Sequence, residues 1–115
     1  MDLMMKMSDN YYQRRALVPK AEAYERESFN WFDVGRGPSY CFTVDDAEFM
    51  RFNETDVIDE WNERYGIMLG EYEEGVYEDG LETMLKEVID SIGEGSISKA
   101  LRTAIDEGTG VYFVF

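Results

Sequence analysis

The negative charge of this 115-residue chain is concentrated in one segment, residues 45–94. That segment holds 17 carboxylates against three basic residues, Arg51, Arg64 and Lys86, and so carries the whole net charge of −14. The remaining 65 residues hold eight acidic and eight basic residues and are neutral together. Charge of one sign repels itself and destabilises a compact state. A fold containing this segment must hold its carboxylates apart at the surface, either as a solvated face or as a surface for a basic partner.

The rest of the composition is that of a folded protein. The chain is 44% hydrophobic and 15% aromatic, whereas acidic disordered chains are poor in aromatic residues. A length of 115 residues lies within the range of one domain with its own core. We therefore expect residues 1–115 to form a single acidic domain, with residues 1–18 as an N-terminal arm.

Cysteine content and hydropathy bear on the compartment. The chain has a single cysteine, Cys41, so it cannot form an internal disulfide. The absence of disulfides is typical of proteins in a reducing cytosol. No window approaches the ~20 apolar residues of a membrane span. Residues 1–7 lack the apolar region and cleavage site of a signal peptide. We expect a cytoplasmic protein outside the membrane, with translation starting at Met1, Met4, Met5 or Met7.

The chain contains no histidine. This excludes Ser-His-Asp and Cys-His catalysis and every zinc site that needs histidine. The acidic clusters at residues 45–48 and 71–74 lack the register of a calcium loop. Residues 106–110 follow a predicted helix and form a turn rather than a phosphate loop. We expect no enzymatic activity, no metal and no cofactor.

Apolar residues at helical spacing predict four helices, at residues 19–32, 54–65, 81–92 and 97–107, with a helical turn at 45–52. Pro19 suits a first helical position. Asn53 or Thr55 caps the second helix and Ser96 the last, while glycines stop the helices that end at residues 65 and 92.

β-Branched and aromatic runs predict three strands, at residues 40–44, 67–72 and 111–115. The last strand is apolar throughout, so we expect it inside the sheet, covered on both faces. Cys41 is expected to be a small core residue. Residues 70–80 are either a hairpin or an exposed acidic loop. The expected fold class is α+β: a single small domain of about three strands with about four helices packed on the sheet.

The predicted helix 54–65 has two sides. Val57, Ile58, Trp61 and Tyr65 form a stripe to be buried, which leaves the acidic residues facing outward. Acids and tyrosines alternate in the loop that follows, where tyrosines could stack on arginines. A further line of carboxylates is expected on Glu82, Glu87, Asp90 and Glu94. The residues expected to bind a partner are Asp56, Asp59, Glu60, Glu63, Glu71, Tyr72, Glu73, Glu74, Tyr77, Glu78, Asp79 and Glu82.

A small, histidine-free, acidic and aromatic-rich α+β chain resembles the inhibitors that phages and plasmids use against host nucleases, the anti-CRISPR and anti-restriction DNA mimics. The resemblance is one of charge and size, and no residue motif carries it. It implies a basic host nuclease, such as a CRISPR effector, as partner, with its nucleic-acid groove blocked. The alternative is an immunity protein or antitoxin that neutralises a basic toxin. Either would be a monomer or homodimer that does not itself bind nucleic acid, since its charge repels phosphate.

Overall fold

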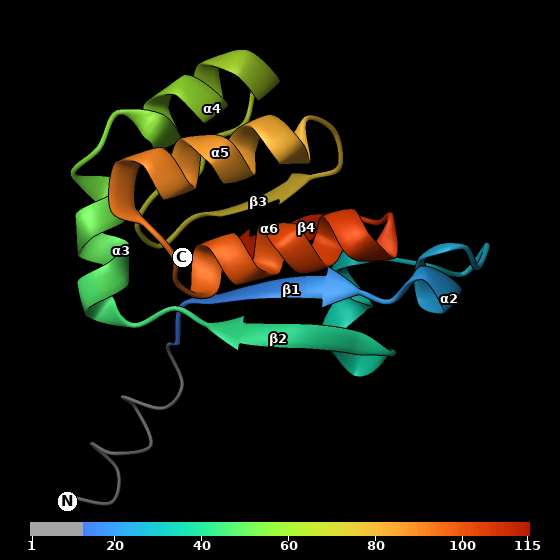
Figure 1. The fold of residues 1–115 in the computed structure, drawn as a ribbon. Helices are drawn as coiled ribbons and strands as arrows, with labels where there is room; N and C mark the ends of the chain where they lie inside the picture. The colour runs from blue at the N-terminus through green and yellow to red at the C-terminus, as the bar shows by residue number, and fades with distance from the viewer. Residues whose placement is uncertain (1–12) are drawn as a thin grey trace, which may run out of the picture.

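Four strands form one antiparallel sheet in the order β2-β1-β4-β3. The computed structural model describes residues 13–115. In it, β1 (Arg15–Pro19) pairs with β2 (Ser39–Thr43) on one side and with β4 (Val111–Val114) on the other. The other edge strand, β3 (Glu74–Tyr77), pairs with β4. The chain thus brings together strands far apart in sequence, and its last strand lies inside the sheet as predicted (Figure 1).

Four helices cover one face of the sheet: α3 (Asp46–Asn53), α4 (Val57–Tyr65), α5 (Leu81–Ile92) and α6 (Ser96–Glu107). Side chains alternate along a strand, so every second residue of β1 and β4 points towards the helices. These residues include Ala16, Val18, Val111 and Phe113, and all four are buried in the main core. The largest fully buried side chains are Trp61, Phe49, Phe52, Phe113, Phe115 and Met84.

The other face of the sheet is only partly covered. The short helix α2 (Ala21–Tyr24) and the 3-10 helix η1 (Trp31–Arg36) follow β1, and η1 lies behind the strands in Figure 1. Val34 of η1 packs with Leu17 and Tyr112 of the sheet in a second, smaller core. The molecule therefore has a thick helical layer on one side of the sheet and a thin layer on the other.

The predicted helices at residues 45–52, 81–92 and 97–107 are present within one residue of their expected bounds. The helix predicted at residues 54–65 begins three residues later, at Val57. Thr55 stands before it: its Oγ1 accepts a hydrogen bond from the Val57 amide at 3.3 Å. Gly66 and Gly93 end their helices with φ angles of 66° and 80°, which glycine adopts without a steric cost.

The prediction for the N-terminal third is wrong in two respects. Arg15 to Val18, expected in an arm, form most of the interior strand β1; the arm's residues 1–12 lie outside the described residues. Pro19 ends that strand and does not begin a helix, so the helix expected at residues 19–32 is reduced to α2 and, after a turn, η1. Pairing with β2 places Pro19 in the strand, whereas residues 21–24 keep their local preference for helix.

The prediction of a strand at residues 67–72 is also wrong, because strand pairing starts only at Glu74. The side chain of Asn62 explains part of the difference. It accepts a hydrogen bond from the Leu69 amide and donates one to the Leu69 carbonyl, both at 2.8 Å. These are the backbone groups that Leu69 would need for strand pairing.

Cys41 lies in the middle of β2, as predicted, but its side chain is exposed and not in the core. Its neighbours Tyr40 and Phe42 point towards the helices, so Cys41 points to the thinly covered face.

The fold is a small α+β domain, with four strands where three were expected and six helical segments within residues 13–115. None of the described helices is both long enough and apolar enough to cross a membrane.

Candidate acidic interaction surface

Helix α4 presents an unbroken acidic side to solvent. Asp56 immediately precedes the helix, and Asp59, Glu60 and Glu63 follow at helical spacing; all four are exposed. Carboxylates three or four residues apart on a helix lie about 5–6 Å apart at Cβ. Within residues 13–115 none of the four makes an ion pair or a side-chain hydrogen bond. They are therefore available to a partner.

The opposite side of α4 is anchored in the core. Trp61 is fully buried, and its ring stacks on Phe113 with centroids 6.2 Å apart. Its indole N–H donates to Glu87 of α5 at 3.4 Å. Arg64 donates two hydrogen bonds to the same carboxylate, at 2.9 and 3.0 Å. The acidic side is thus displayed on a helix fixed to its neighbour by packing and by a bidentate ion pair.

Arg64 and Trp61 also lower the pKa of Glu87. The hydrogen bonds from Arg64 have the largest effect, partial burial acts in the opposite direction, and the hydrogen bond from Trp61 adds to the lowering. Glu87 is therefore ionised and engaged within the protein. It is not available to a partner, contrary to the prediction that placed it on a binding line.

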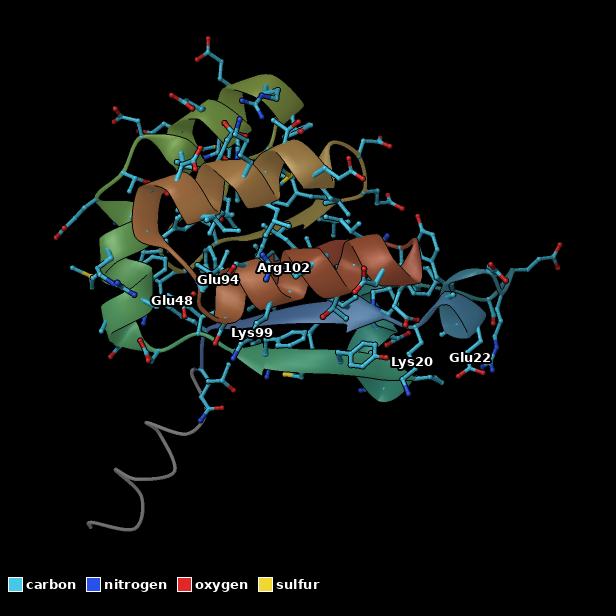
Figure 2. The ribbon with its side chains drawn as sticks, in the orientation of Figure 1. Lys20, Glu22, Glu48, Glu94, Lys99 and Arg102 are labelled. Carbon is cyan, nitrogen blue, oxygen red and sulfur yellow. The ribbon has the colours of Figure 1, made fainter. Side chains whose placement is uncertain are left out.

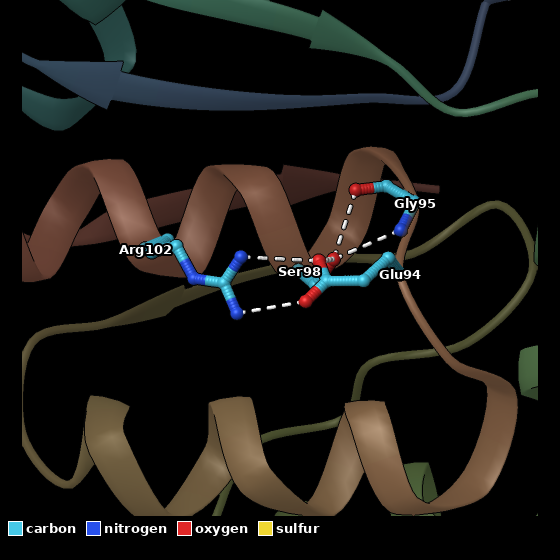
Figure 3. Close-up of polar contacts among 4 residues, drawn as sticks. All are labelled: Glu94, Gly95, Ser98 and Arg102. Carbon is cyan, nitrogen blue, oxygen red and sulfur yellow. Dashed lines mark hydrogen bonds and ion pairs between the residues drawn. The ribbon is translucent and has the colours of Figure 1, made fainter.

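Glu94, expected on the same line, is also engaged (Figure 3). Arg102 donates to both of its carboxylate oxygens, at 2.8 and 3.2 Å, and the Ser98 hydroxyl donates at 2.9 Å. These contacts lower the pKa of Glu94, with Arg102 as the main cause. Of the second line of carboxylates expected to bind a partner, only Glu82 and Asp90 remain exposed and without an ion pair within the described residues. Lys86 lies between them in the sequence.

Strand β3 divides the predicted acidic loop into two groups. Glu71 lies in the turn before the strand, where Arg14 forms an ion pair with it at 3.4 Å and also contacts Asp46 of α3. Glu73, exposed, is at the same end, where its carbonyl accepts from the Phe115 amide at 3.0 Å. A four-residue strand spans about 13 Å, so these two acids lie well away from Glu78 and Asp79. Glu74 belongs to the strand itself.

The two tyrosines of this loop have opposite environments. Tyr72 is exposed and has a positive φ of 64°. Tyr77 is buried against Trp61 and Phe113, with ring centroids 5.7 and 5.9 Å away. Burial raises the pKa of Tyr77, and the nearby Tyr65 adds to the effect. Tyr77 was predicted to bind a partner; it is instead a core residue, because the register of β3 turns it towards the helices.

Glu78, Asp79 and Glu82 are brought together at a groove. The groove, of about 440 Å³, lies between the start of α5 and the end of α6. Glu78 accepts a hydrogen bond from the Tyr24 hydroxyl, which raises the pKa of that tyrosine to about 12. The C-terminal end of α4 borders this region, because an ideal Cβ on Gly80 would lie 2.3 Å from the Tyr65 hydroxyl. The groove acids therefore lie near the C-terminal end of α4.

One acidic residue of the segment has a role that the sequence analysis missed. Glu48 is buried and accepts hydrogen bonds from the Ser96 and Ile97 amides, at 3.0 and 2.9 Å. Glu48 therefore caps α6 from another helix, and Figure 2 shows its position on α3 beside the start of α6. Ser96 is not the cap that was predicted. The sequence contained an indication that Glu48 is buried, because helical spacing places it on the same side of α3 as the core residues Phe49 and Phe52.

Within residues 13–115, no group of three or more acidic or cysteine side chains is placed to hold a metal ion. No protein-family model matches the chain, and comparison with curated proteins and with solved structures finds no match. The candidate site is therefore defined by geometry and charge alone. It consists of the α4 acids Asp56, Asp59, Glu60 and Glu63, together with Glu78, Asp79 and Glu82 at the neighbouring groove.

Proposed function

We propose that this protein is an acidic inhibitor that binds a basic nucleic-acid-binding protein, a host nuclease such as a CRISPR effector, and occupies its nucleic-acid groove. The observation that carries the proposal is the acidic side of α4, whose four carboxylates are exposed and unpaired within the described residues on a rigidly anchored helix. On a face that served only solubility, ion pairs with nearby bases could relieve the repulsion among the carboxylates, whereas these four have no such partner within the described residues.

The spacing of charge along α4 supports nucleic-acid mimicry. Asp56 and Glu63 are about 10.5 Å apart along the helix axis, at 1.5 Å per residue. Four successive phosphates of one DNA strand span about 10.2 Å of the duplex axis, at 3.4 Å each. The helix thus offers four negative charges over the length at which a DNA strand offers four. A groove lined by Lys and Arg to hold a phosphate backbone would meet a similar charge density here.

The groove beside α4 enlarges this surface. Glu78, Asp79 and Glu82 add three exposed carboxylates next to the C-terminal end of the helix. Charge-assisted hydrogen bonds from arginine to carboxylate are about twice as strong as neutral ones and can be bidentate. We expect the α4 acids to make the main contact and the groove acids to extend it.

The proposal is tested by neutralising α4 and measuring whether the partner still loses its nucleic acid. The variant is Asp59→Asn/Glu60→Gln/Glu63→Gln. The matched control is Glu22→Gln/Glu25→Gln/Glu27→Gln, which changes three exposed acids outside the segment and alters the net charge equally. Partners are captured from host lysate with the wild-type protein and identified by mass spectrometry. Binding of labelled DNA or RNA by the captured protein is then measured with each variant.

We expect the wild type and the control to displace nucleic acid from the captured protein, and the α4 variant to need at least about tenfold higher concentration, because several charge-assisted contacts are lost together. Equal inhibition by the α4 variant and the control would contradict the proposal. A captured toxin that binds no nucleic acid and is encoded beside this gene would instead identify an immunity protein.

A further inference from the structure

The face of the sheet opposite α4 carries a second, chemically different surface. A groove of about 410 Å³ lies between η1 and the strands. Its apolar lining includes Leu17, Val34 and Val114, and the exposed thiol of Cys41 opens into it. Beside it lies a hollow of about 320 Å³ lined mainly by Trp31, Ile67, Val76 and Tyr112. Contiguous apolar surface of this kind marks an interaction site more often than chance exposure does.

Phe32 projects from η1 between the two hollows and lines both of them. Its side chain is 80% exposed, although η1 buries Val34 two residues later. An apolar knob and apolar hollows therefore occupy the same face. A two-fold interface requires a surface that is complementary to itself, with the same patch on both copies.

The charges of this face favour a second copy of the chain. The groove is lined by Arg15, Arg36 and Glu74, and Asp33 lies 4.0 Å from Arg36, so the face is neutral although the chain carries −14. Copies that met through α4 would bring like charges together, which destabilises an interface. Copies that meet through the η1 face keep their α4 helices on opposite outer sides, and basic and acidic groups are available to pair across the contact.

We propose that the protein forms a two-fold homodimer through the η1 face, in which Phe32 of each copy enters the groove of the other beside Leu17, Cys41 and Val114. This inference does not rest on the proposed function, because it uses the other side of the sheet. The dimer would display two α4 acidic sides, one on each outer surface.

The experiment measures sedimentation velocity over low to high micromolar concentrations, with Phe32→Ser as the test variant. Met68→Ser is the matched control. Met68 is also a large apolar side chain that is 80% exposed, but it does not line either hollow. We expect a wild-type monomer–dimer equilibrium, and a dimerisation constant weakened on the order of 100-fold in the Phe32 variant, since a two-fold contact loses both side chains. The Met68 variant should resemble the wild type.

The single cysteine provides a second, independent readout without mutation. Cys41 should react with a maleimide rapidly at low protein concentration and more slowly as the dimer forms, and Phe32→Ser should abolish this dependence. Added salt should leave the dimer intact, whereas it should weaken binding through α4. A wild type that stays monomeric at high concentration would overturn the proposal. So would equal effects of the two variants, or Cys41 protection that is independent of concentration and lost on deleting residues 1–12.

Discussion

Tyr77 shows how one residue's environment separates a binding role from a core role. Its hydroxyl is buried and has no hydrogen-bond partner among the described residues, and an unpaired buried polar group costs about 1–3 kcal/mol. We therefore expect Tyr77→Phe to leave the free energy of unfolding unchanged or to raise it by about 1 kcal/mol, with no effect on partner binding. Urea denaturation measures the first quantity.

Tyr112→Phe is the matched control for that experiment. Burial and the nearby Glu74 carboxylate raise the pKa of the Tyr112 hydroxyl to about 12. Removing this hydroxyl should lower stability by about 1 kcal/mol. A loss of stability in the Tyr77 variant as large as in the Tyr112 variant would mean that the Tyr77 hydroxyl is bonded.

The cap of α6 gives a second prediction at this scale. Glu48→Ala removes the acceptor for two amides at the start of α6, the part-buried one of Ser96 and the buried one of Ile97. We expect a loss of about 2–4 kcal/mol in the free energy of unfolding, because both amides lose their partner and a negative charge leaves the helix N-terminus. Ser96→Ala should be nearly neutral. The opposite order in urea denaturation would restore Ser96 as the cap.

At the scale of elements, the contact of α4 with α5 should depend on pH. Arg64 and Trp61 lower the pKa of Glu87 below its usual value of 4.5. A carboxyl whose pKa is lower in the folded than in the unfolded state stabilises the fold above its unfolded-state pKa, and this contribution is lost as the pH falls through the folded-state value. The ion pair should therefore be fully effective at pH 7 and ineffective in strong acid.

Glu87→Gln should lower the free energy of unfolding by about 1 kcal/mol at pH 7. The difference from wild type should shrink below pH 4.5, the usual pKa of the group. Glu63→Gln is the control on the exposed side of α4; at pH 7 it should be neutral or slightly stabilising, because it removes only repulsion. Thermal unfolding at neutral and acid pH measures both. A constant difference for Glu87→Gln across this range would mean that the ion pair contributes nothing.

For the whole molecule, the net charge of −14 sets the response to salt. Repulsion among the 25 acidic residues exceeds what 11 basic residues offset, and salt screens repulsion between exposed groups beyond about 10 Å at 0.1 M. We expect the melting temperature of the free protein to rise between low and physiological salt. Over the same range the association rate with a basic partner should fall, because screening removes the steering force.

With added salt the melting temperature should rise while the association rate falls. A slower association therefore cannot be attributed to loss of structure, because the protein becomes more stable under the same conditions. The α4 triple variant should show a smaller rise in melting temperature and a smaller fall in association rate. An association rate that is flat between low and physiological salt would argue against a contact made through the acidic surface.

Sequence alone could predict the elements whose signals are local. The stripe of apolar residues in α5 acts within one or two turns of helix, and so do Gly66 and Gly93, which have positive φ angles. The predicted ends of α4 and α5 agree with the structure at these glycines. The exposure of the α4 acids followed from the same periodicity. These features depend on helical spacing and backbone sterics, which the neighbouring residues determine.

What only the tertiary structure decided depends on pairing between distant residues. Arg15 to Val18 form a strand because β2 and β4 lie on either side. The direction in which Cys41 and Tyr77 point follows from strand register, in which a shift of one residue reverses the face. Most of all, the sequence determined that residues 45–94 carry the net charge of −14. Only the fold decided which carboxylates are engaged, because ion pairs and helix caps form between groups brought together in space.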